Sequence, residues 1–274
     1  MSIIVQLTDP HIRVPKQLAY GRIDTAPYLR AGVASIKALR QRPHAVVITG
    51  DLTDFGRAIE YAHFKELLSP LDIPVYLLPG NHDDRQTLRD SFPEHTYLGQ
   101  GPFIQYAVDI GPVRVVAIDT CIAGESGGSL CTERLDWLDA MLQKSQDRPV
   151  IIAMHHPPFR TLIGHMDDIG LIAGGDVLEA IVSKYKNVER IICGHLHRAI
   201  DARFGGTIAS TSPAPAHQVT LDLDDAAAST WMLEPPSFRV HAWDARSRRL
   251  VTHLAPIGQF EGPYPFHDNG ALID

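Results

Sequence analysis

The sequence predicts an α/β fold, a four-layer α/β/β/α sandwich with two mixed β-sheets. Over the first two-thirds of the chain, short apolar runs alternate with segments whose apolar residues recur at helical spacing. Beyond His197 only strand-like runs follow, and a simple doubly wound sheet does not explain that change. Five short polar motifs follow five of the apolar runs, and open α/β sheets carry their chemistry at the carboxyl ends of strands.

In the alternating region each expected strand is a short apolar run, and the expected helices other than the short one at 86–91 have an apolar stripe. The helix at 26–40 places Leu29, Val33 and Ile36 on one face. A capping-box pattern that begins at Ser129 marks the start of the helix at 132–143. The strands are expected at residues 3–7, 45–49, 74–78, 104–108, 113–118, 150–154 and 188–193, and the helices at 26–40, 57–68, 86–91, 132–143 and 176–185.

The last third predicts strands alone, at residues 199–204, 207–210, 219–223, 237–243 and 248–254. Residues 212–236 are rich in Ser, Pro and Ala, and we expect them to form a long loop or flap. These parts together predict one domain over residues 1–257. The tail at 258–274 has Gly, Pro and aromatic residues without periodicity, so we expect it to pack irregularly or to reach a neighbouring subunit.

Composition and charge exclude several classes of protein. The 274 residues carry a net charge of −7 without a basic stripe, which argues against polymeric nucleic acid as a partner. A membrane association is not expected, because no segment has the length and apolar content of a membrane span. The three cysteines lack the spacing of a disulfide framework, which fits a reducing compartment. The N-terminal residues show no signal-peptide pattern, and we expect a cytoplasmic protein.

The first three motifs offer ligands for a divalent metal. Asp9 and His11 are separated by one residue, so both can point into one site where the strand unwinds into a loop. Asp51 follows a buried strand, and its carboxylate can bridge two cations; capping of the next helix explains this aspartate equally well on that motif alone. Asn81 adds a neutral carbonyl oxygen directly after the third strand.

The last two motifs add imidazoles. His155 ends an apolar strand just before two prolines, and we favour it over His156 as a ligand. His195 and His197 are again separated by one residue at the end of a strand. A set of carboxylate, amide and imidazole ligands suits two borderline-hard divalent metals.

In this serial order the five motifs resemble the calcineurin-like metallophosphoesterase superfamily, over about residues 3–197. Longer stretches resemble its class III cyclic nucleotide phosphodiesterases, and they resemble its glycerophosphodiesterases at least as well. These stretches are YGRID at 20–24, RPHAVV at 42–47, GDLTDFG at 50–56, PGNHDD at 79–84 and MHHPP at 154–158. The resemblance implies the metallophosphoesterase fold, with residues 1–257 as the catalytic domain. It also implies two divalent metal ions (Fe, Mn, Co or Zn), one held by Asp9, His11, Asp51 and His197 and the other by Asp51, Asn81, His155 and His195.

The implied activity is metal-dependent hydrolysis of small phosphodiesters, either 3′,5′-cyclic nucleotides such as cAMP or glycerophosphodiesters. We expect a metal-bridging hydroxide to attack phosphorus, with Asp51 as the bridging carboxylate. His82 is expected to bind the substrate and to neutralise phosphoryl charge or protonate the leaving oxygen. Asp83 is expected to accept the other ring proton of His82. The resemblance places His217 at the substrate pocket. The alternative that His217 is an exposed histidine on a loop fits the sequence nearly as well.

Two other functions stay open on the sequence. One is a phosphomonoesterase of the same fold. The other is a scaffold that kept the fold and lost the chemistry, which the complete ligand set disfavours. The remaining histidines, His165 among them, have no motif and are expected to be structural or surface residues. Resemblance to oligomeric enzymes also implies a homo-oligomer, a dimer or larger, with an interface at the helix 57–68 and the C-terminal tail.

Overall fold

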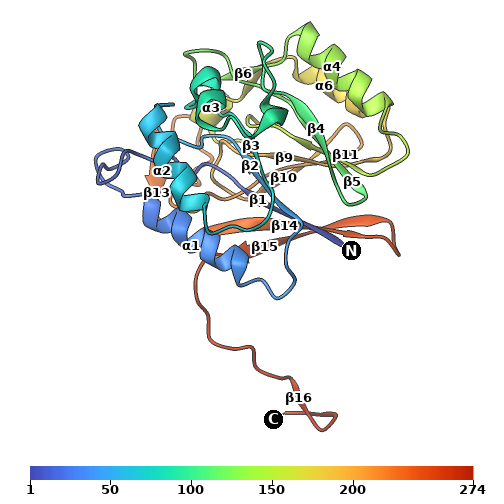
Figure 1. Ribbon diagram of the computed structural model, residues 1–274. Helices are drawn as coiled ribbons and strands as arrows, with labels where there is room; N and C mark the ends of the chain where they lie inside the picture. The colour runs from blue at the N-terminus through green and yellow to red at the C-terminus, as the bar shows by residue number, and fades with distance from the viewer. Residues whose placement is uncertain (274) are drawn as a thin grey trace.

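The computed structural model describes residues 1–273 and shows two mixed β-sheets with helices on their outer faces (Figure 1). The four layers expected from the sequence are therefore confirmed. Among the residues described, no helix has both the length and the apolar character needed to cross a membrane.

The first sheet is built around three parallel strands and has the order β15–β14–β1–β2–β3. Its central strands β1 and β2 are mostly apolar because they are buried on both faces. Helices α1, α2 and α3 cover its outer face (Figure 1). The bounds are β1 (Ser2–Leu7), β2 (Ala45–Thr49), β3 (Val75–Leu78), β14 (Ser237–Asp244), β15 (Arg249–Pro256), α1 (Ala26–Lys37), α2 (Ala58–Leu68) and α3 (Arg85–Ser91).

The second sheet has the order β10–β11–β9–β7–β5–β4, with antiparallel strands at its two edges. Helices α4 and α6 pack on its outer face. The bounds are β4 (Tyr106–Ile110), β5 (Val113–Ala117), β7 (Val150–Ala153), β9 (Val188–Cys193), β10 (Ile200–Phe204), β11 (Thr207–Thr211), α4 (Thr132–Gln143) and α6 (Gly175–Val182).

Alternation along the strands of the second sheet divides the core into two parts. Ile151 and Ala153 of β7 belong to the cluster that includes the first sheet. Ile152, between them, belongs to the cluster with Leu138 of α4 and Leu178 of α6. Successive side chains of a strand point to opposite faces, so each central strand contributes to both layers of core.

A buried polar link joins the two sheets at Gln6. Its side-chain amide donates to Thr49 Oγ1 at 3.1 Å in the first sheet and to the carbonyl of Cys193 at 2.9 Å in the second. Its Oε1 accepts from His241 Nε2 of β14 at 3.2 Å. A fully buried amide needs such partners, and these partners fix how the two sheets face each other.

The predicted capping box of α4 is wrong. Ser129 lies in the short strand β6 (Gly128–Ser129), where its hydroxyl accepts from Arg134 Nη2 at 3.0 Å. The N-cap position of α4 belongs to Cys131 instead. Ser129 is therefore taken up by the loop around β6, which pairs with β8 (Leu171–Ala173).

The strand expected at 219–223 is also wrong beyond its first residue. The strand here is β12 (Gln218–Val219), which pairs antiparallel with β13 (Trp231–Met232). Residues 212–236, expected as a loop or flap, therefore contain a short ladder. Other elements of two to four residues carry no readable period and were not expected, namely η1 (Thr96–Leu98), α5 (Gly164–Asp167), β16 (His267–Asp268) and β17 (Ala271–Leu272).

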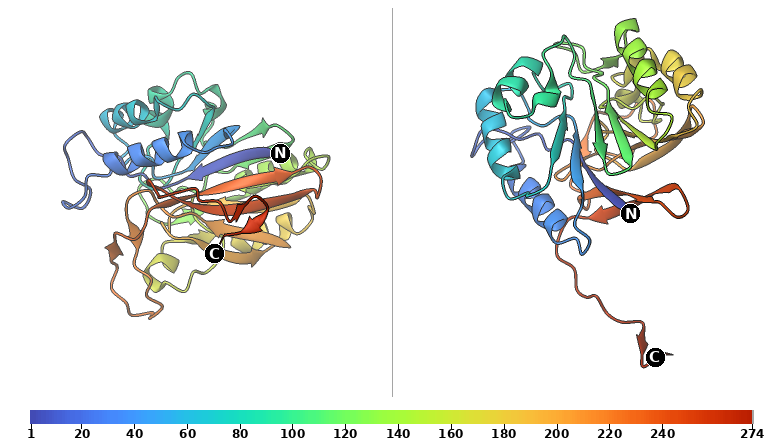
Figure 2. Two further views of the ribbon diagram at one scale, coloured as in Figure 1. Left: turned by 90° about the horizontal axis from the view of Figure 1, so that it is seen from below. Right: turned by 45° about the vertical axis from the view of Figure 1, so that its right-hand side comes forward.

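The chain beyond Ile257 leaves the body of the molecule. Figure 1 and the right-hand view of Figure 2 show it running away from the two sheets toward the β16–β17 ladder. The tail thus differs from the irregular packing that was one of the two expectations for it.

Candidate metal centre

The residues predicted as metal ligands meet where the carboxyl ends of the two sheets come together. Asp9, Asp51 and Asn81 follow strands β1, β2 and β3 of the first sheet. His155, His195 and His197 follow β7 and β9 of the second sheet, and His11 follows Asp9 after one residue. Backbone hydrogen bonds from Asp9 N to the Gly50 carbonyl (3.0 Å) and from Gly194 N to the His155 carbonyl (3.0 Å) hold neighbouring loops together.

The backbone is strained at these positions. Positive φ angles occur at five of the seven predicted ligands, with values of 51° at Asp9, 45° at His11, 49° at Asp51, 70° at His195 and 52° at His197. L-residues rarely adopt this region, and such strain concentrates at functional sites. The left-handed turn directs each of these side chains back into the space between the strand ends.

Two glycines permit the close approach of the loops. A Cβ atom on Gly50 would collide with the ring of His155, and one on Gly80 would collide with the carboxylate of Asp51. Gly50 also has a φ of 100°, which a side chain would disfavour. The glycine in each motif is therefore needed for the ligands to come together.

The first group of side chains is formed by Asp9, His11, Asp51 and His197, whose ligand atoms lie within 4.8 Å of one another. His11 Nε2 is 3.5 Å from Asp51 Oδ2 and 3.2 Å from His197 Nε2. His197 Nε2 is 3.5 Å from Asp9 Oδ1. All four residues are buried, so their polar atoms face one another and not water.

A second group adjoins the first at Asp51. His155 Nε2 lies 3.5 Å from Asp51 Oδ2 and 3.0 Å from the side-chain oxygen of Asn81. The ring of His195 stands 5.2 Å from that of His155, centroid to centroid. The structure thus brings together all seven side chains predicted as ligands, and Asp51 lies between the two groups.

Hydrogen bonds orient the imidazoles so that their Nε2 atoms point inward. His155 Nδ1 donates to the Thr49 carbonyl at 2.8 Å, and His197 Nδ1 donates to the His217 carbonyl at 3.0 Å. His11 Nδ1 lies 3.3 Å from Asp54 Oδ1. A carbonyl oxygen only accepts, so the proton of a neutral ring stays on Nδ1 and Nε2 keeps its lone pair for a metal.

The charges in the cluster are strongly coupled. Burial raises the pKa of Asp9 to about 6. Burial acts in the same direction on Asp51, but His155 and His82 overcome it and lower the pKa of Asp51 well below its usual value. Burial also opposes the charge on His155, yet Asp51 raises the pKa of His155 to about 9. Negative charge concentrated on Asp51 therefore attracts a proton or a cation to the same place.

The donor set fits divalent cations. His195 Nε2 is buried, and within residues 1–273 it has no hydrogen-bond partner. His11 and His197 direct two Nε2 atoms toward each other, an arrangement that one shared cation satisfies better than one shared proton. His156, by contrast, places Nδ1 2.8 Å from Thr120 Oγ1 and Nε2 3.0 Å from the Ser126 carbonyl, so both of its ring nitrogens are occupied.

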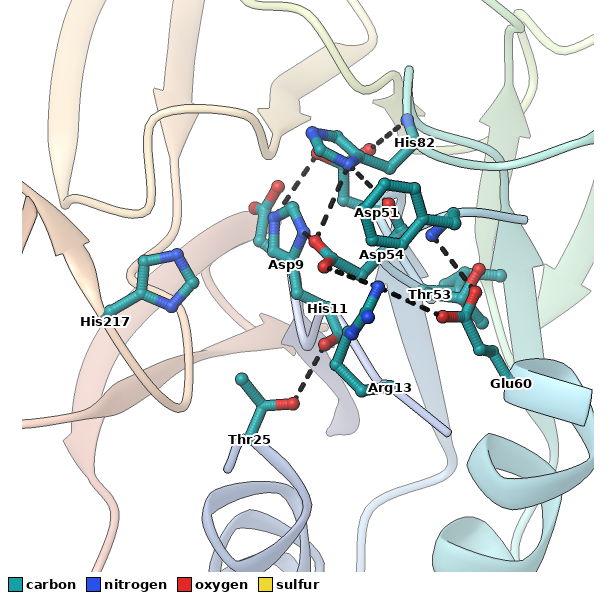
Figure 3. A network of polar contacts seen from close by, with 12 residues as sticks. Asp9, His11, Arg13, Thr25, Asp51, Thr53, Asp54, Glu60, His82 and His217 are labelled. Carbon is teal, nitrogen blue, oxygen red and sulfur yellow. Dashed lines mark hydrogen bonds and ion pairs between the residues drawn. The ribbon is translucent and has the colours of Figure 1, made fainter. Parts of the chain in front are cut away.

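His82 lies beside the cluster but outside it, as Figure 3 shows. Its backbone N donates to Asp51 Oδ1 at 2.9 Å, and its Nδ1 donates to the Asp54 carbonyl at 2.9 Å. Its side chain is 33% exposed, which leaves Nε2 accessible to a ligand in the pocket. The expectation that Asp83 accepts the other ring proton is wrong, because Asp83 instead accepts from Leu52 N, Gly80 N and the Tyr61 hydroxyl.

A buried charge network supports this corner of the site. The Asp54 carboxylate accepts from Arg13 Nη1 at 3.2 Å, and the same Nη1 atom lies 3.4 Å from Glu60 Oε1 (Figure 3). Glu60 Oε2 in turn accepts from the backbone N of Phe55 at 3.1 Å. The loop that carries Asp54 is therefore fixed from α2.

The cluster opens into a pocket of about 250 Å³. His217 lines it, with its ring centroid 5.5 Å from that of His11 and 5.1 Å from that of Tyr20. Burial lowers the pKa of His217 to about 3, so its ring is neutral at ordinary pH. The structure thus places His217 in the pocket, whereas the sequence alone also allowed an exposed position on a loop. A larger groove of about 560 Å³ beside α6 shares Met166 with this pocket.

The family model of the calcineurin-like phosphoesterases matches residues 3–199. The chain belongs to the calcineurin-like phosphoesterase family. It is 39% identical over 273 residues to a probable glycerophosphodiester phosphodiesterase GpdQ of Arcobacter nitrofigilis, a match that covers 99% of this chain and 100% of that protein. It is 28% identical over 216 residues to the 3′,5′-cyclic adenosine monophosphate phosphodiesterase CpdA of Pseudomonas aeruginosa, covering 79% of this chain and 77% of that protein.

A solved structure of a dimetal phosphatase from Danio rerio has the same fold as this phosphoesterase. The TM-score is 0.65 at 16% identity, with 94% of this chain and 97% of the other covered. The likeness concerns the fold alone. The assignment of individual ligands in this family member stays a prediction that the geometry above supports.

Sequence reasoning missed several residues that line the pocket of this phosphoesterase. His165, expected to be structural or at the surface, lies in the pocket lining with Ser126, Thr230 and Trp231. His165 comes from α5, and Ser126 and Thr230 come from loops without a motif, so no local signal could have identified those three; Trp231 belongs to β13. Asp54 stands within the quoted GDLTDFG motif, yet its contact with both His11 and His82 depends on how three loops meet.

Proposed function

We propose that this protein is a metal-dependent phosphodiesterase that hydrolyses small phosphodiesters. The observation that carries the proposal is the arrangement of two ligand groups around Asp51, with the half-exposed His82 facing the same pocket. Family membership supports hydrolysis of a phosphoester. Glycerophosphodiesters rank before 3′,5′-cyclic nucleotides because the relative named for the former matches the whole chain at 39% identity.

Two divalent metal ions fit the site best. Asp9, His11, Asp51 and His197 would hold one ion. Asp51, Asn81, His155 and His195 would hold the other. When bound, such ions act as Lewis acids toward the phosphate and lower the pKa of water. The mixed nitrogen and oxygen set accommodates Fe, Mn, Co or Zn.

His82 has the position of the general acid. Its Nδ1 proton is directed to the Asp54 carbonyl, so the proton available to a substrate is the one on Nε2. In the protonated ring, Nε2 donates that proton to the leaving oxygen as the P–O bond breaks, or it holds the charge on a phosphoryl oxygen. Asp51 contributes by fixing the backbone N of His82 while its other oxygen faces the ligand groups.

The pocket wall favours a small substrate. His217 is neutral and has a buried Nδ1 atom without a partner among residues 1–273, so it binds substrate through a hydrogen bond and not through charge. A volume of about 250 Å³ admits a compact diester more readily than a polymer. The net charge of −7 also disfavours a polyanion as substrate.

We further infer that the enzyme is a homo-oligomer and acts in the cytoplasm. The unpaired cysteines Cys121, Cys131 and Cys193 fit a reducing compartment. An apolar C-terminal tail that leaves the body supports association between copies.

The test compares initial rates of Mn²⁺-loaded protein on bis(p-nitrophenyl) phosphate and p-nitrophenyl phosphate, and then on glycerophosphoethanolamine and cAMP. We expect a strong preference for diesters that chelation and Asp51→Asn abolish. A preference for p-nitrophenyl phosphate would point to a phosphomonoesterase instead. Absence of metal-dependent turnover on all four would contradict the proposal and favour a scaffold without chemistry.

A further inference from the structure

The chain after β15 forms an extended arm, defined here as residues 259–273. Its starting point is fixed on α1, because Ile257 is buried in contact with the position of Gly32 and Gly258 N donates to Ser35 Oγ at 3.1 Å. From there the arm runs away from both sheets and ends in the β16–β17 ladder (Figure 1 and the right-hand view of Figure 2).

The arm exposes several large apolar side chains. Phe260 is 68% exposed, Tyr264 70%, Phe266 81% and Leu272 69%. A single exposed apolar residue is ordinary, but four on one short arm indicate a surface that meets a partner. A ladder of two-residue strands is not stable in water without a surface to pack on. The arm therefore lacks a contact that it needs.

A groove of about 590 Å³ between α1 and α2 has matching chemistry. Its lining is apolar, while two cationic side chains stand at its rim; the residues are Arg30, Val33, Ala34, Lys37, Ala38, Leu67 and Pro70. The arm contains Glu261 and Asp268 and has neither lysine nor arginine. Apolar surface and charge are thus complementary between the arm and the groove.

We propose that the arm of one copy docks in the α1–α2 groove of a second copy. The origin of the arm and the groove both lie on α1, so a twofold axis beside this helix lets each copy receive the arm of the other. Such an exchange is isologous and closes as a pair. The arm, about 50 Å long when extended, points away from its own groove, and only a reversal next to Gly258 would bring it back.

This inference deepens the proposed homo-oligomer by naming its contact, and it does not depend on the phosphodiesterase chemistry. Mass is measured by sedimentation equilibrium, and the rate on bis(p-nitrophenyl) phosphate is measured on the same samples. The variants are the full chain, a chain that ends at Gly258, Ala34→Glu in the groove and Ala180→Glu as a matched control. Ala180 is an exposed alanine of α6, far from the groove residues in sequence and on the other sheet.

We expect the full chain and Ala180→Glu to associate into a pair of twice the 30.2 kDa chain mass or a multiple of it. Truncation should give a monomer, and Ala34→Glu should weaken association roughly 10- to 100-fold, because it places an unpaired carboxylate in an apolar groove. All four should keep their metal-dependent rate, which shows that each is folded.

Three results would overturn the inference. They are a monomeric full chain, a pair that truncation leaves intact, and a pair that Ala34→Glu and Ala180→Glu weaken equally. None of these would affect the chemistry, because the rate measurement tests that separately. Loss of the rate in every sample, with the masses as expected, would contradict the phosphodiesterase and leave the arm exchange supported.

Discussion

His82 combines a fixed ring with an accessible nitrogen. The Asp54 carbonyl holds Nδ1, and the Asp51 carboxylate holds the backbone N, so the ring is directed toward the pocket without belonging to the ligand groups. The histidines around it are buried and direct their Nε2 atoms at one another or at carboxylates. This contrast assigns different chemistry to neighbouring imidazoles.

His82→Ala should lower kcat roughly 10²- to 10⁴-fold, because it removes the proton donor for the leaving oxygen. Metal content, measured by inductively coupled plasma mass spectrometry, should stay that of the unmodified enzyme. His253→Ala, at an exposed position of β15, serves as the control and should change neither value. Loss of metal from the His82 variant would instead make this residue a ligand.

Asp54→Asn should weaken metal binding roughly 10- to 100-fold, because His11 loses a charged acceptor for Nδ1 and Arg13 loses one of its two carboxylate partners. The backbone carbonyl that holds His82 is retained, so kcat at saturating metal should fall much less than in His82→Ala. Competition with a chromogenic chelator measures the affinity. Asp72→Asn, which removes a surface pair with Arg42, is the matched control, and equal affinities in the two variants would contradict a role for Asp54.

The convergence of the predicted ligands was predictable at this scale, whereas their hydrogen-bond partners were not. Asp51 and His155 each follow the end of an apolar strand after one intervening residue, so strand ends and residue type together suggest a metal group. Which atom meets the second nitrogen of His82 depends on the path of the loop from Asp51 to Asp54. The sequence therefore suggested the Asp83 carboxylate, where the structure has the carbonyl of Asp54.

At the scale of elements, α3 links the site loop to the second sheet. Its N-cap residue Asp84 accepts from Thr87 N at 2.8 Å and from Thr87 Oγ1 at 2.7 Å. Arg85, the next residue, makes a bidentate pair with the buried Asp119, at 2.6 and 2.8 Å. The short helix thereby holds the loop of Asn81 and His82 against β5.

Asp84→Ala should lower the free energy of unfolding by about 0.5–2 kcal/mol, because the first turn of α3 loses its side-chain acceptor. Urea denaturation of the metal-free protein measures the change. Asp90→Ala, in the same helix, removes an exposed acceptor of Gln86 and should have a smaller effect. Equal losses in the two variants would show that the cap is not what stabilises the start of α3.

Helices with a long apolar stripe were predicted to within a few residues, as the comparison of 26–40 with Ala26–Lys37 shows. Caps and short elements were not. The capping pattern expected before α4 began at Ser129, but in the structure the Ser129 hydroxyl accepts from Arg134 instead. Helix α5, which brings His165 to the pocket, has four residues and therefore no period to detect.

For the molecule as a whole, Gln6 joins two sheets that each carry half of the site, and His241 of the first sheet holds the side-chain oxygen of Gln6 in place. His241 is fully buried; its Nε2 donates to Gln6 Oε1 at 3.2 Å, and its Nδ1 accepts from the Thr252 hydroxyl at 2.9 Å. The bond that Nδ1 accepts requires the neutral ring, whereas Nε2 donates in either protonation state. Burial lowers the pKa of His241 well below its usual value, and Arg190 and Arg239 act in the same direction.

The sign of the pH dependence follows from proton binding in the two states. Below about pH 6.5 the unfolded chain protonates His241 and the folded chain does not, so this residue makes unfolding easier as pH falls. The contribution of His241 to the free energy of unfolding is complete above the pKa that this residue has in the unfolded chain. Below that pKa the contribution decreases by at most about 1.4 kcal/mol per pH unit. The decrease continues until the folded pKa is reached.

His241→Asn should therefore be less stable at pH 7.5 but should lose less stability than the unmodified protein between pH 7.5 and pH 5.5. Urea denaturation with a chelator present measures both differences. The histidines predicted as metal ligands are present in both proteins, so their contribution cancels in the comparison. Parallel pH profiles for the two proteins would show that His241 accepts a proton in the folded state, and the link between the sheets would then not be the acid-sensitive contact of this fold.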